Sequence, residues 1–269
     1  MAVDSKANLN LDVAATRFTK VEGLGNDFVL VEHDEPSEWP IERVRAVCDR
    51  HRGVGADGVL LLRSVADADA RMIVLNADGS RPEMCGNGLR CAALYLSERT
   101  GRDQLTVLTD AGVRTAAVQN GQVVVSMGQV SVLDEAPLGA DGQGAVWTQV
   151  DAGNPHLVTF DLPPADALRV GPLLTAHPLF PNGTNVECAR ISNGQIDLVV
   201  WERGAGYTLA CGTGAAAAAA LAWSQGLLPD GRTVVNLPGG PLTVWRDGNL
   251  QMQQGRARLV FSGHLPQAT

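Results

Sequence analysis

The sequence predicts an α+β fold built from two pseudo-symmetric halves, and three observations support this prediction. Short strands alternate with a few helices along 269 residues, a length that suits one large domain or two of roughly 100–150 residues each. Two of the helices are apolar on nearly every face, which is typical of helices enclosed by other elements. The motif Cys-Gly-X-Gly occurs at 85–88 and again at 211–214, each time directly before one of these helices.

The first helix of the chain is expected directly after Pro40, because proline suits the first turn of a helix. Its apolar face consists of residues at helical spacing: Ile41, Val44, Val47 and Cys48. Short apolar runs broken by turns predict strands on both sides of this helix, at 18–21, 28–31, 59–62 and 72–75.

A second helix, over 89–96, is apolar on almost every face and should end at Gly101, so we expect it to be buried. Strands at 113–118 and 123–126 follow it. They are joined through Asn120-Gly121, a dipeptide typical of tight hairpins.

The second half repeats this plan. A strand at 149–150 leads to a turn at Gly153-Asn154, and a short helix is expected over 166–176. A hairpin over 191–202 turns at Asn193-Gly194. The alanine-rich segment 215–222, ending near Gly226, predicts a buried helix whose small side chains let strands approach closely; strands that turn at Asp247-Gly248 follow.

Four landmarks share the same order and near-equal spacing in the two halves. A glycine follows the asparagine of each Gly-Asn turn by 29 residues, and the cysteine follows that asparagine by 59 or 57 residues. A polar residue ends a strand nine residues before each cysteine. The pairs are Gly25-Asn26 and Gly153-Asn154, Gly55 and Gly183, Asn76 and Glu202, and Cys85 and Cys211. This repetition indicates a duplicated chain with its two thiols facing one cleft.

Each of these two cysteines is expected at the N-terminus of a helix, where free N–H groups and about half a positive charge favour anions. We therefore expect the pKa of Cys85 and Cys211 to be lowered. The N–H groups of Gly86-Asn87 and Gly212-Thr213 are suited to hold a carboxylate and the charge that develops when its α-proton leaves. One acid and one base on opposite faces of a carbon are the minimum needed to invert it.

Composition argues against several function classes. With 21 Lys and Arg against 29 Asp and Glu, the net charge is −8, so neither nucleic acid nor an anionic membrane surface is an expected partner. No apolar stretch approaches the ~20 residues that span a bilayer. Lys6 and Lys20 are the only lysines, which argues against an enzyme that binds pyridoxal phosphate through a Schiff base.

The five cysteines are odd in number and none are spaced as Cys-X-X-Cys, which favours free thiols in a reducing compartment and no zinc site. Cys48, Cys91 and Cys188 are expected to pack in the core. Residues 53–58 match the Gly-X-Gly-X-X-Gly dinucleotide pattern, but a helix precedes them and a strand follows, the reverse of the required order. We expect neither a metal nor a cofactor.

Six segments, in chain order, closely resemble the diaminopimelate epimerases: GLGNDFVLVE, DRHRGVGADGVLL, NADGSRPEMCGNGLRCAA, GNPH, HPLFPNGTNVE and ERGAGYTLACGTGAAAAA. The resemblance covers Phe18 to about His264. It implies two halves, each a mixed β-sheet or barrel curled around a central α-helix, with the C-terminal strand returning to the first half. It also implies interconversion of LL- and meso-2,6-diaminopimelate without a cofactor, in the route to lysine and peptidoglycan precursors.

The resemblance also implies roles for individual residues. Cys85 and Cys211 match the two catalytic cysteines of the family, of which one thiolate removes the α-proton and the opposite thiol returns a proton to the other face. Gly86-Asn87 and Gly212-Thr213 match the positions that hold the carboxylate of the reacting end. Further substrate-binding positions are Asn26, Asn76, Asn154, Asn185, Glu202 and Arg203. His156 and Glu202 match residues that adjust the cysteine pKa values and hold the substrate ammonium group.

The expected domain organisation has three parts. Residues 1–15 form a disordered extension with no counterpart in the family, 16–129 with a C-terminal strand at 258–269 form the first half, and 130–257 form the second. The resemblance also makes a homodimer plausible. The first fifteen residues lack the apolar stretch of a secretion signal, so we expect a cytoplasmic protein.

Three alternatives remain at the level of sequence. A proline or hydroxyproline racemase shares the fold and the paired cysteines, but tends to carry histidine where Asn87 stands and has no need for Asn76, Asn185 and Arg203.

A cysteine hydrolase would use Cys85 as nucleophile and His156 as base, and would leave Cys211 unexplained. In a non-enzymatic binding module, two exposed reactive thiols would be a liability.

Overall fold

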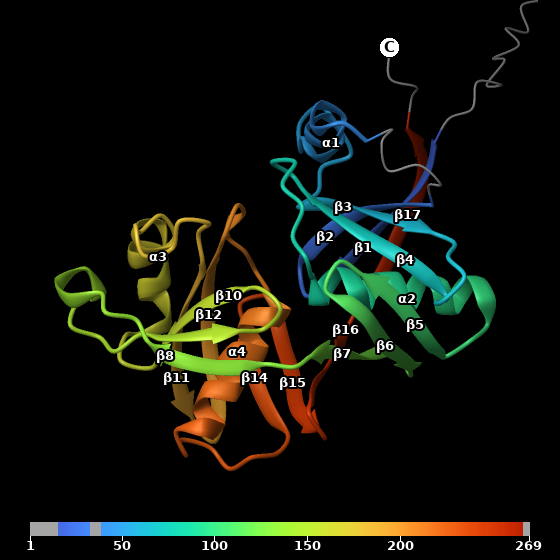
Figure 1. Ribbon diagram of the computed structural model, residues 1–269. Coiled ribbons are helices and arrows are strands. Elements are labelled where there is room, and N and C mark those ends of the chain that lie inside the picture. The colour runs from blue at the N-terminus through green and yellow to red at the C-terminus, as the bar shows by residue number, and fades with distance from the viewer. Residues whose placement is uncertain (1–15, 33–38, 266–269) are drawn as a thin grey trace, which may run out of the picture.

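The computed structural model describes residues 16–32 and 39–265, so the predicted extension over 1–15 lies outside the described residues. Seventeen strands of this part join into one hydrogen-bonded sheet. Figure 1 shows these strands gathered in two groups, one around α2 and one around α4. The strands are β1 (Thr16–Gly23), β2 (Asn26–Glu32), β3 (Gly58–Arg63), β4 (Ala70–Asn76), β5 (Gln104–Thr109), β6 (Gly112–Gln119), β7 (Gln122–Gly128), β8 (Ser131–Glu135), β9 (Thr148–Asp151), β10 (Pro155–Thr159), β11 (Asn185–Ser192), β12 (Gln195–Glu202), β13 (Gly206–Tyr207), β14 (Thr233–Leu237), β15 (Gly240–Asp247), β16 (Leu250–Arg256) and β17 (Arg258–Leu265). The helices are α1 (Ile41–Cys48), α2 (Gly86–Thr100), α3 (Ala167–Thr175) and α4 (Gly212–Ser224).

The strand pairings follow the same plan twice. One series runs β17-β1-β2-β3-β4-β5-β6-β7, and the other runs β8-β9-β10-β11-β12-β14-β15-β16. In both series the third and fifth pairings are parallel and the others antiparallel. β7 and β16, the last strand of each series, pair with each other and join the two halves. The predicted α+β fold with two pseudo-symmetric halves is confirmed.

One strand departs from the order of the chain. β17 pairs with β1, the place that β8 takes beside β9 in the second half. Whereas β8 directly precedes β9, β17 is the last described strand and reaches β1 from the far end of the chain. The first half is therefore completed by a strand that follows the whole second half in sequence.

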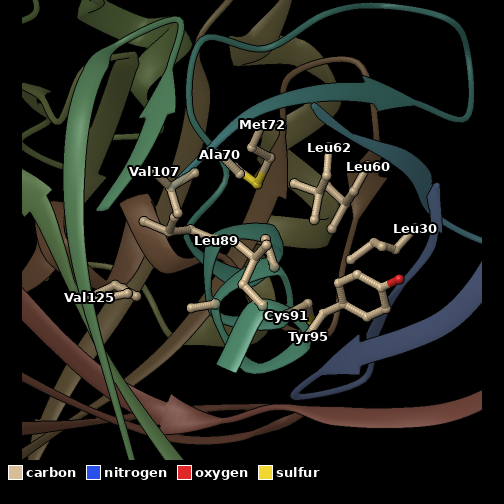
Figure 2. Packing of buried hydrophobic residues seen from close by; sticks show 14 of the residues in the cluster. Leu30, Leu60, Leu62, Ala70, Met72, Leu89, Cys91, Tyr95, Val107 and Val125 are labelled. Atoms are coloured by element: carbon tan, nitrogen blue, oxygen red, sulfur yellow. The ribbon is translucent and has the colours of Figure 1, made fainter. Parts of the chain in front are cut away.

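Each half encloses one helix and carries another on its outer side (Figure 1). α2 packs against β1, β5, β6 and β7, and α4 against β8, β10, β12 and β15. Figure 2 shows side chains of the surrounding strands converging on α2. The labelled side chains are Leu30, Leu60, Leu62, Ala70, Met72, Val107 and Val125 from the strands, with Leu89, Cys91 and Tyr95 from the helix.

The helices bear out most of the local predictions. Gly101 ends α2 in the left-handed conformation at φ 70°, which glycine adopts without strain. The alanines of α4 are at most 1% exposed, because small side chains allow the strands to lie close to the helix on every side. No helix among the described residues is long and apolar enough to cross a membrane.

The hairpin predictions are confirmed and one detail of the first helix is wrong. Asn120-Gly121 and Asn193-Gly194 turn with positive φ at both residues. Val44, Val47 and Cys48 are buried as expected, but Ile41 is 47% exposed. It stands in the first turn of α1, beside the loop at Gly79, and so lies beyond the face that packs on the sheet.

Candidate active site

A cavity of about 980 Å³ is lined by residues from both halves, including Cys85 and Cys211. The first turns of α2 and α4 meet at its wall. A methyl group added at Gly212 would lie only 3.2 Å from the Cα of Gly86. Two helix N-termini, each preceded by a thiol, thus point into one enclosed space.

The two thiols have the same local geometry. Cys85 (φ −141°, ψ 105°) and Cys211 (φ −125°, ψ 111°) each take the N-cap position in extended conformation. Each Sγ accepts a hydrogen bond of 3.3 Å from an N–H group three residues later, at Gly88 and at Gly214. The sulfur atoms therefore occupy the place of the oxygen atom in an ordinary helix cap.

The predicted lowering of the thiol pKa is wrong for this structure. Burial raises the pKa of Cys85 to about 12, and it raises the pKa of Cys211 well above its ordinary value. The reason is that a buried thiolate loses its hydration. The N–H groups of Gly88 and Gly214 lower both pKa values, but burial and the negative charge of Glu202 outweigh them.

Asn87 links the first turn of α2 to the segment before α4. Its Nδ2 donates to Asn26 Oδ1 at 3.1 Å and to the carbonyl oxygen of Ala210, directly before Cys211, at 2.7 Å. Asn26 in turn donates to Asp57 Oδ2 at 2.8 Å. The bond to Ala210 crosses between the halves and ties the start of α2 to the residue before Cys211.

The second half has a different polar chain at the corresponding place. The ring of His156 lies between Glu187 Oε1, 2.6 Å from Nδ1, and Asn154 Oδ1, 2.8 Å from Nε2. Both ring nitrogens therefore have a hydrogen-bond partner. His156 is 1% exposed and does not line the cavity, so it reaches the cavity only through Asn154.

Glu202 lines the cavity at the end of β12. Burial raises its pKa to about 7, although hydrogen bonds from the Thr208 hydroxyl and from Cys211 and the charge of His156 lower it. Near neutral pH, this carboxyl group is therefore close to the midpoint of its titration.

Asn185 and Arg203 are neighbours in the wall of the cavity, where Asn185 is buried and Arg203 is partly exposed. Asn185 Oδ1 accepts from the backbone N–H of Arg203 at 2.9 Å. The Arg203 guanidinium lies 3.3 Å from the Glu83 carboxylate of the other half, and is 26% exposed. Asn76, at the end of β4, donates to Ser80 Oγ at 2.9 Å. Polar groups from both halves thus surround the outer part of the cavity.

The sequence-predicted site residues come together in this cavity, apart from His156. Those that line it are Asn26, Asn76, Cys85, Gly86, Asn87, Asn154, Asn185, Glu202, Arg203, Cys211, Gly212 and Thr213. Cys91 and Cys188 are buried in the core as predicted, while Cys48 packs in the core and also reaches the cavity. The buried Lys20 is engaged in an ion pair of 2.6 Å with Asp27.

Sequence reasoning missed several buried polar groups behind the cavity. Glu187 is 0% exposed, and a methyl group at Gly214 would lie 2.9 Å from its Oε1, beside the first turn of α4. Gln253 lies against the start of both helices, with its amide atoms unpartnered among the described residues. Within the described ranges, no three His, Cys, Asp or Glu side chains are grouped to share a metal ion.

Comparison with known proteins points to one family. The family model for diaminopimelate epimerase matches residues 18–133 and 148–260. Diaminopimelate epimerase of Desulfitobacterium hafniense is 41% identical, over 91% of this chain and 96% of that protein. The enzyme of Magnetococcus marinus is 43% identical over 93% of this chain and 96% of that protein. The chloroplastic enzyme of Oryza sativa is 41% identical over 93% of this chain and 80% of its own length.

Solved structures of other proteins share the fold at low sequence identity. A hydroxyproline epimerase from Agrobacterium vitis superposes with a TM-score of 0.73 at 17% identity, covering 93% of this chain and 92% of that one. A PhzF-family protein from Bacillus anthracis has a TM-score of 0.71 at 15% identity, covering 94% of this chain and 100% of that one. The sequence matches are far closer than these, and the chain belongs to the diaminopimelate epimerase family.

Proposed function

We propose that this protein is an isomerase that interconverts LL- and meso-2,6-diaminopimelate by proton transfer between Cys85 and Cys211 and substrate. The observation that carries the proposal is the pair of N-cap thiols on one cavity, one from each half of a duplicated chain. A base and an acid on opposite sides of an α-carbon can remove a proton from one face and deliver another to the opposite face.

The carboxylate of the reacting centre would lie over the two helix N-termini. Gly86 and Asn87 at one helix, and Gly212 and Thr213 at the other, direct N–H groups of the first turn toward the cavity. These fixed dipoles favour the negative charge that moves onto the carboxylate as the α-proton leaves. The chain's own backbone thereby supplies stabilisation without a resident cofactor.

The reacting ammonium group would lie beside Glu202. The negative charge of the Glu202 carboxylate raises the pKa of both thiols. A bound ammonium group neutralises that charge and brings a positive charge near the sulfurs, which lowers their pKa. Substrate therefore helps to form the thiolate that removes its α-proton. Exclusion of water as the halves close would strengthen this electrostatic effect.

The distal amino-acid end would be held by the polar groups of the outer wall. Arg203 offers a planar cationic fork suited to a second carboxylate. Asn76, Asn154 and Asn185 provide amide donors and acceptors for the distal ammonium and carboxylate groups. Proline has no second charged end, so this set of residues favours diaminopimelate over the racemase alternative.

The hydrolase alternative is disfavoured by the position of His156. Its two ring nitrogens are engaged with Glu187 and Asn154, and the ring does not line the cavity. A general base must lie within hydrogen-bond reach of its nucleophile, directly or through one water. The paired thiols, unlike His156, line the cavity and can serve there as acid and base.

The deciding experiment incubates LL-diaminopimelate and L-proline separately with the enzyme in deuterated water. We expect deuterium at the inverted α-carbon of meso-diaminopimelate and no turnover of proline, read by NMR and chiral chromatography. Label in proline would favour the racemase alternative, and inversion without any label would contradict proton transfer with solvent-exchangeable thiols.

We also propose a homodimer in the cytoplasm and a division of the chain into 16–129 with 258–269 and 130–257. The five cysteines are free thiols, which suits a reducing compartment. Val260 and Phe261 of β17 are 43% and 51% exposed at the edge of the sheet beside β1, and support pairing with a second copy. Light scattering of Phe261→Asp and wild-type protein tests the dimer: the variant should be monomeric.

A further inference from the structure

Arg90 is a cation buried without a counter-ion in the described part of the chain. It lies on α2, one turn beyond Cys85, and is 0% exposed. Its Nη2 donates to Asn87 Oδ1 at 2.5 Å, while Nε and Nη1 have no hydrogen-bond partner in the described structure. Burial of an unpaired charge is costly, so this arginine calls for a role beyond packing.

The surrounding backbone leaves room for this guanidinium. A methyl group at Gly255 of β16 would lie 3.2 Å from Arg90 Nε, and one at Gly23 of β1 would lie 3.6 Å from Nη2. Arg90 thus lies between a strand of each half. Burial lowers its pKa to about 10, so the side chain stays positively charged at neutral pH.

Arg90 determines which way the Asn87 amide points. Because Asn87 Oδ1 accepts from the guanidinium, Nδ2 is directed to Asn26 and to the Ala210 carbonyl. The Ala210 carbonyl directly precedes Cys211. A single buried cation is therefore the anchor of the hydrogen bonds that set the two helix starts relative to each other.

The buried arginine after the N-cap cysteine is present in the first half and has no equivalent in the second. Arg90 follows Cys85 by five residues, and the residue that follows Cys211 by five is Ala216. Beside the start of α4 lies the Glu187 carboxylate instead. Arg90 and Glu202 act on Cys85, so the first thiol has an opposing pair of charges, whereas the groups that act on Cys211 include the two carboxyl groups of Glu187 and Glu202.

We propose that Arg90 is a positioning residue that orients Asn87 and provides a fixed positive charge for the anion formed at Cys85, while Cys211 lacks such a charge. The inference rests on the proposed function for its catalytic meaning. Its physical content is independent of the substrate: the Cys85 thiolate is stabilised relative to the Cys211 thiolate. The other ionisable groups that face Arg90 are Cys91 and Glu22.

The test measures the reactivity of each thiol separately. Cys85 is alkylated by iodoacetamide in a Cys211→Ala background, and Cys211 in a Cys85→Ala background, from pH 6 to 10. Peptide mass spectrometry separates these thiols from Cys48, Cys91 and Cys188. With Arg90→Met added, alkylation of Cys85 at pH 8 should slow about tenfold, the equivalent of one pKa unit. The rate for Cys211 should change less than twofold.

Arg90→Lys keeps the charge and loses the planar fork. We expect it to retain most of the Cys85 reactivity while α-proton exchange still falls, because Asn87 is no longer fixed. If Arg90→Met does not fold, as judged by circular dichroism, Arg90→Gln replaces it under the same criterion, since glutamine is neutral and can still donate to Asn87.

Two outcomes overturn the inference: an unchanged Cys85 rate in the neutral variant, or an equal slowing at both thiols. Exchange of the diaminopimelate α-proton by wild-type enzyme is measured in parallel. Absence of that exchange would contradict the proposed function alone, because the alkylation rates do not depend on a substrate.

Discussion

The starts of α2 and α4 share one backbone and differ in what surrounds them. At both, an N-cap thiol accepts an N–H bond of 3.3 Å and the same strand order encloses the helix. Behind Cys85 lie Arg90 and the Asn87 amide, whereas beside the start of α4 lie Glu187 and His156. Duplication thus supplied two equal anion sites, and side-chain changes made the two thiols chemically unequal.

The most severe way to break this comparison removes one thiol at a time. Cys85→Ala and Cys211→Ala should each reduce epimerisation by about 10²–10⁴-fold, the usual contribution of a general acid or base. Turnover of LL- and meso-diaminopimelate by chiral chromatography measures the loss. Cys188→Ala, in the core beneath α3, is the matched control and should keep its activity. Near-normal turnover by either site variant would contradict a two-base mechanism.

The second change removes the buried hydrogen-bond partner of Glu187. His156→Ala leaves the Glu187 carboxyl group without this partner, so the free energy of unfolding should fall by about 1–3 kcal/mol. Urea denaturation followed by circular dichroism measures it. Adding Glu187→Gln should restore part of the loss. If His156→Ala alone is as stable as wild type, the hydrogen bond between His156 and Glu187 does not contribute to stability.

Glu202 and Asn76 hold equivalent places at the ends of β12 and β4, and only one of them titrates. Because the pKa of Glu202 is raised to about 7, its charge is lost as pH falls through 7, and kcat/KM should fall with it. Glu202→Gln should remove this dependence and lower kcat/KM about tenfold at pH 8, in keeping with 1.5–3 kcal/mol for a charged hydrogen bond.

The same carboxyl group should affect stability in the opposite sense. Its folded pKa lies above the ordinary value of 4.5, so wild-type protein loses stability relative to Glu202→Gln as pH rises from 4.5 through 7.

Asn76→Ala is the kinetic control from the first half: it should lower kcat/KM without changing the dependence of kcat/KM on pH. If kcat/KM depends on pH in the same way in wild type and Glu202→Gln, Glu202 takes no part in the reaction.

The smallest effects should be equal in the two halves. Asn120 and Asn193 both have φ 51° in two-residue hairpins. Replacement of either by alanine should cost about 1 kcal/mol, because local hydrogen bonds of the asparagine side chain favour this left-handed conformation and alanine cannot make them. Replacement by glycine should be nearly neutral. Thermal unfolding measures both, and a loss in only one half would indicate that the halves unfold separately.

The sequence predicted what lies in contiguous motifs. Cys85, Cys211 and the helix turns after them were found because a short repeated string carries the whole local geometry. The spacing of the repeat also relates Asp57 to Asn185, because Asp57 follows Asn26 by 31 residues and Asn185 follows Asn154 by 31. Asp57 could have been found as the cavity-lining partner of Asn26 in this way.

The features that the sequence did not reveal are those that depend on burial, which arises only when the sheet encloses a residue. Arg90 and Glu187 resemble ordinary charged residues of a helix and a strand, and only their enclosure makes them unusual. The direction of the thiol pKa was wrong for the same reason, since helix position is visible in sequence and depth is not. β5 and β14 were missed although each alternates buried with more exposed residues, the pattern of a strand with one face in the core.

The pairing of β17 with β1 has a consequence for synthesis on the ribosome. The half that is translated first keeps β1 without its outer neighbour until the last described strand has left the exit tunnel. The later half has all its strands available earlier, because β8 directly precedes β9. We expect chains that are truncated at residue 257 and released from the ribosome to protect α4 from protease better than α2, an order opposite to that of translation.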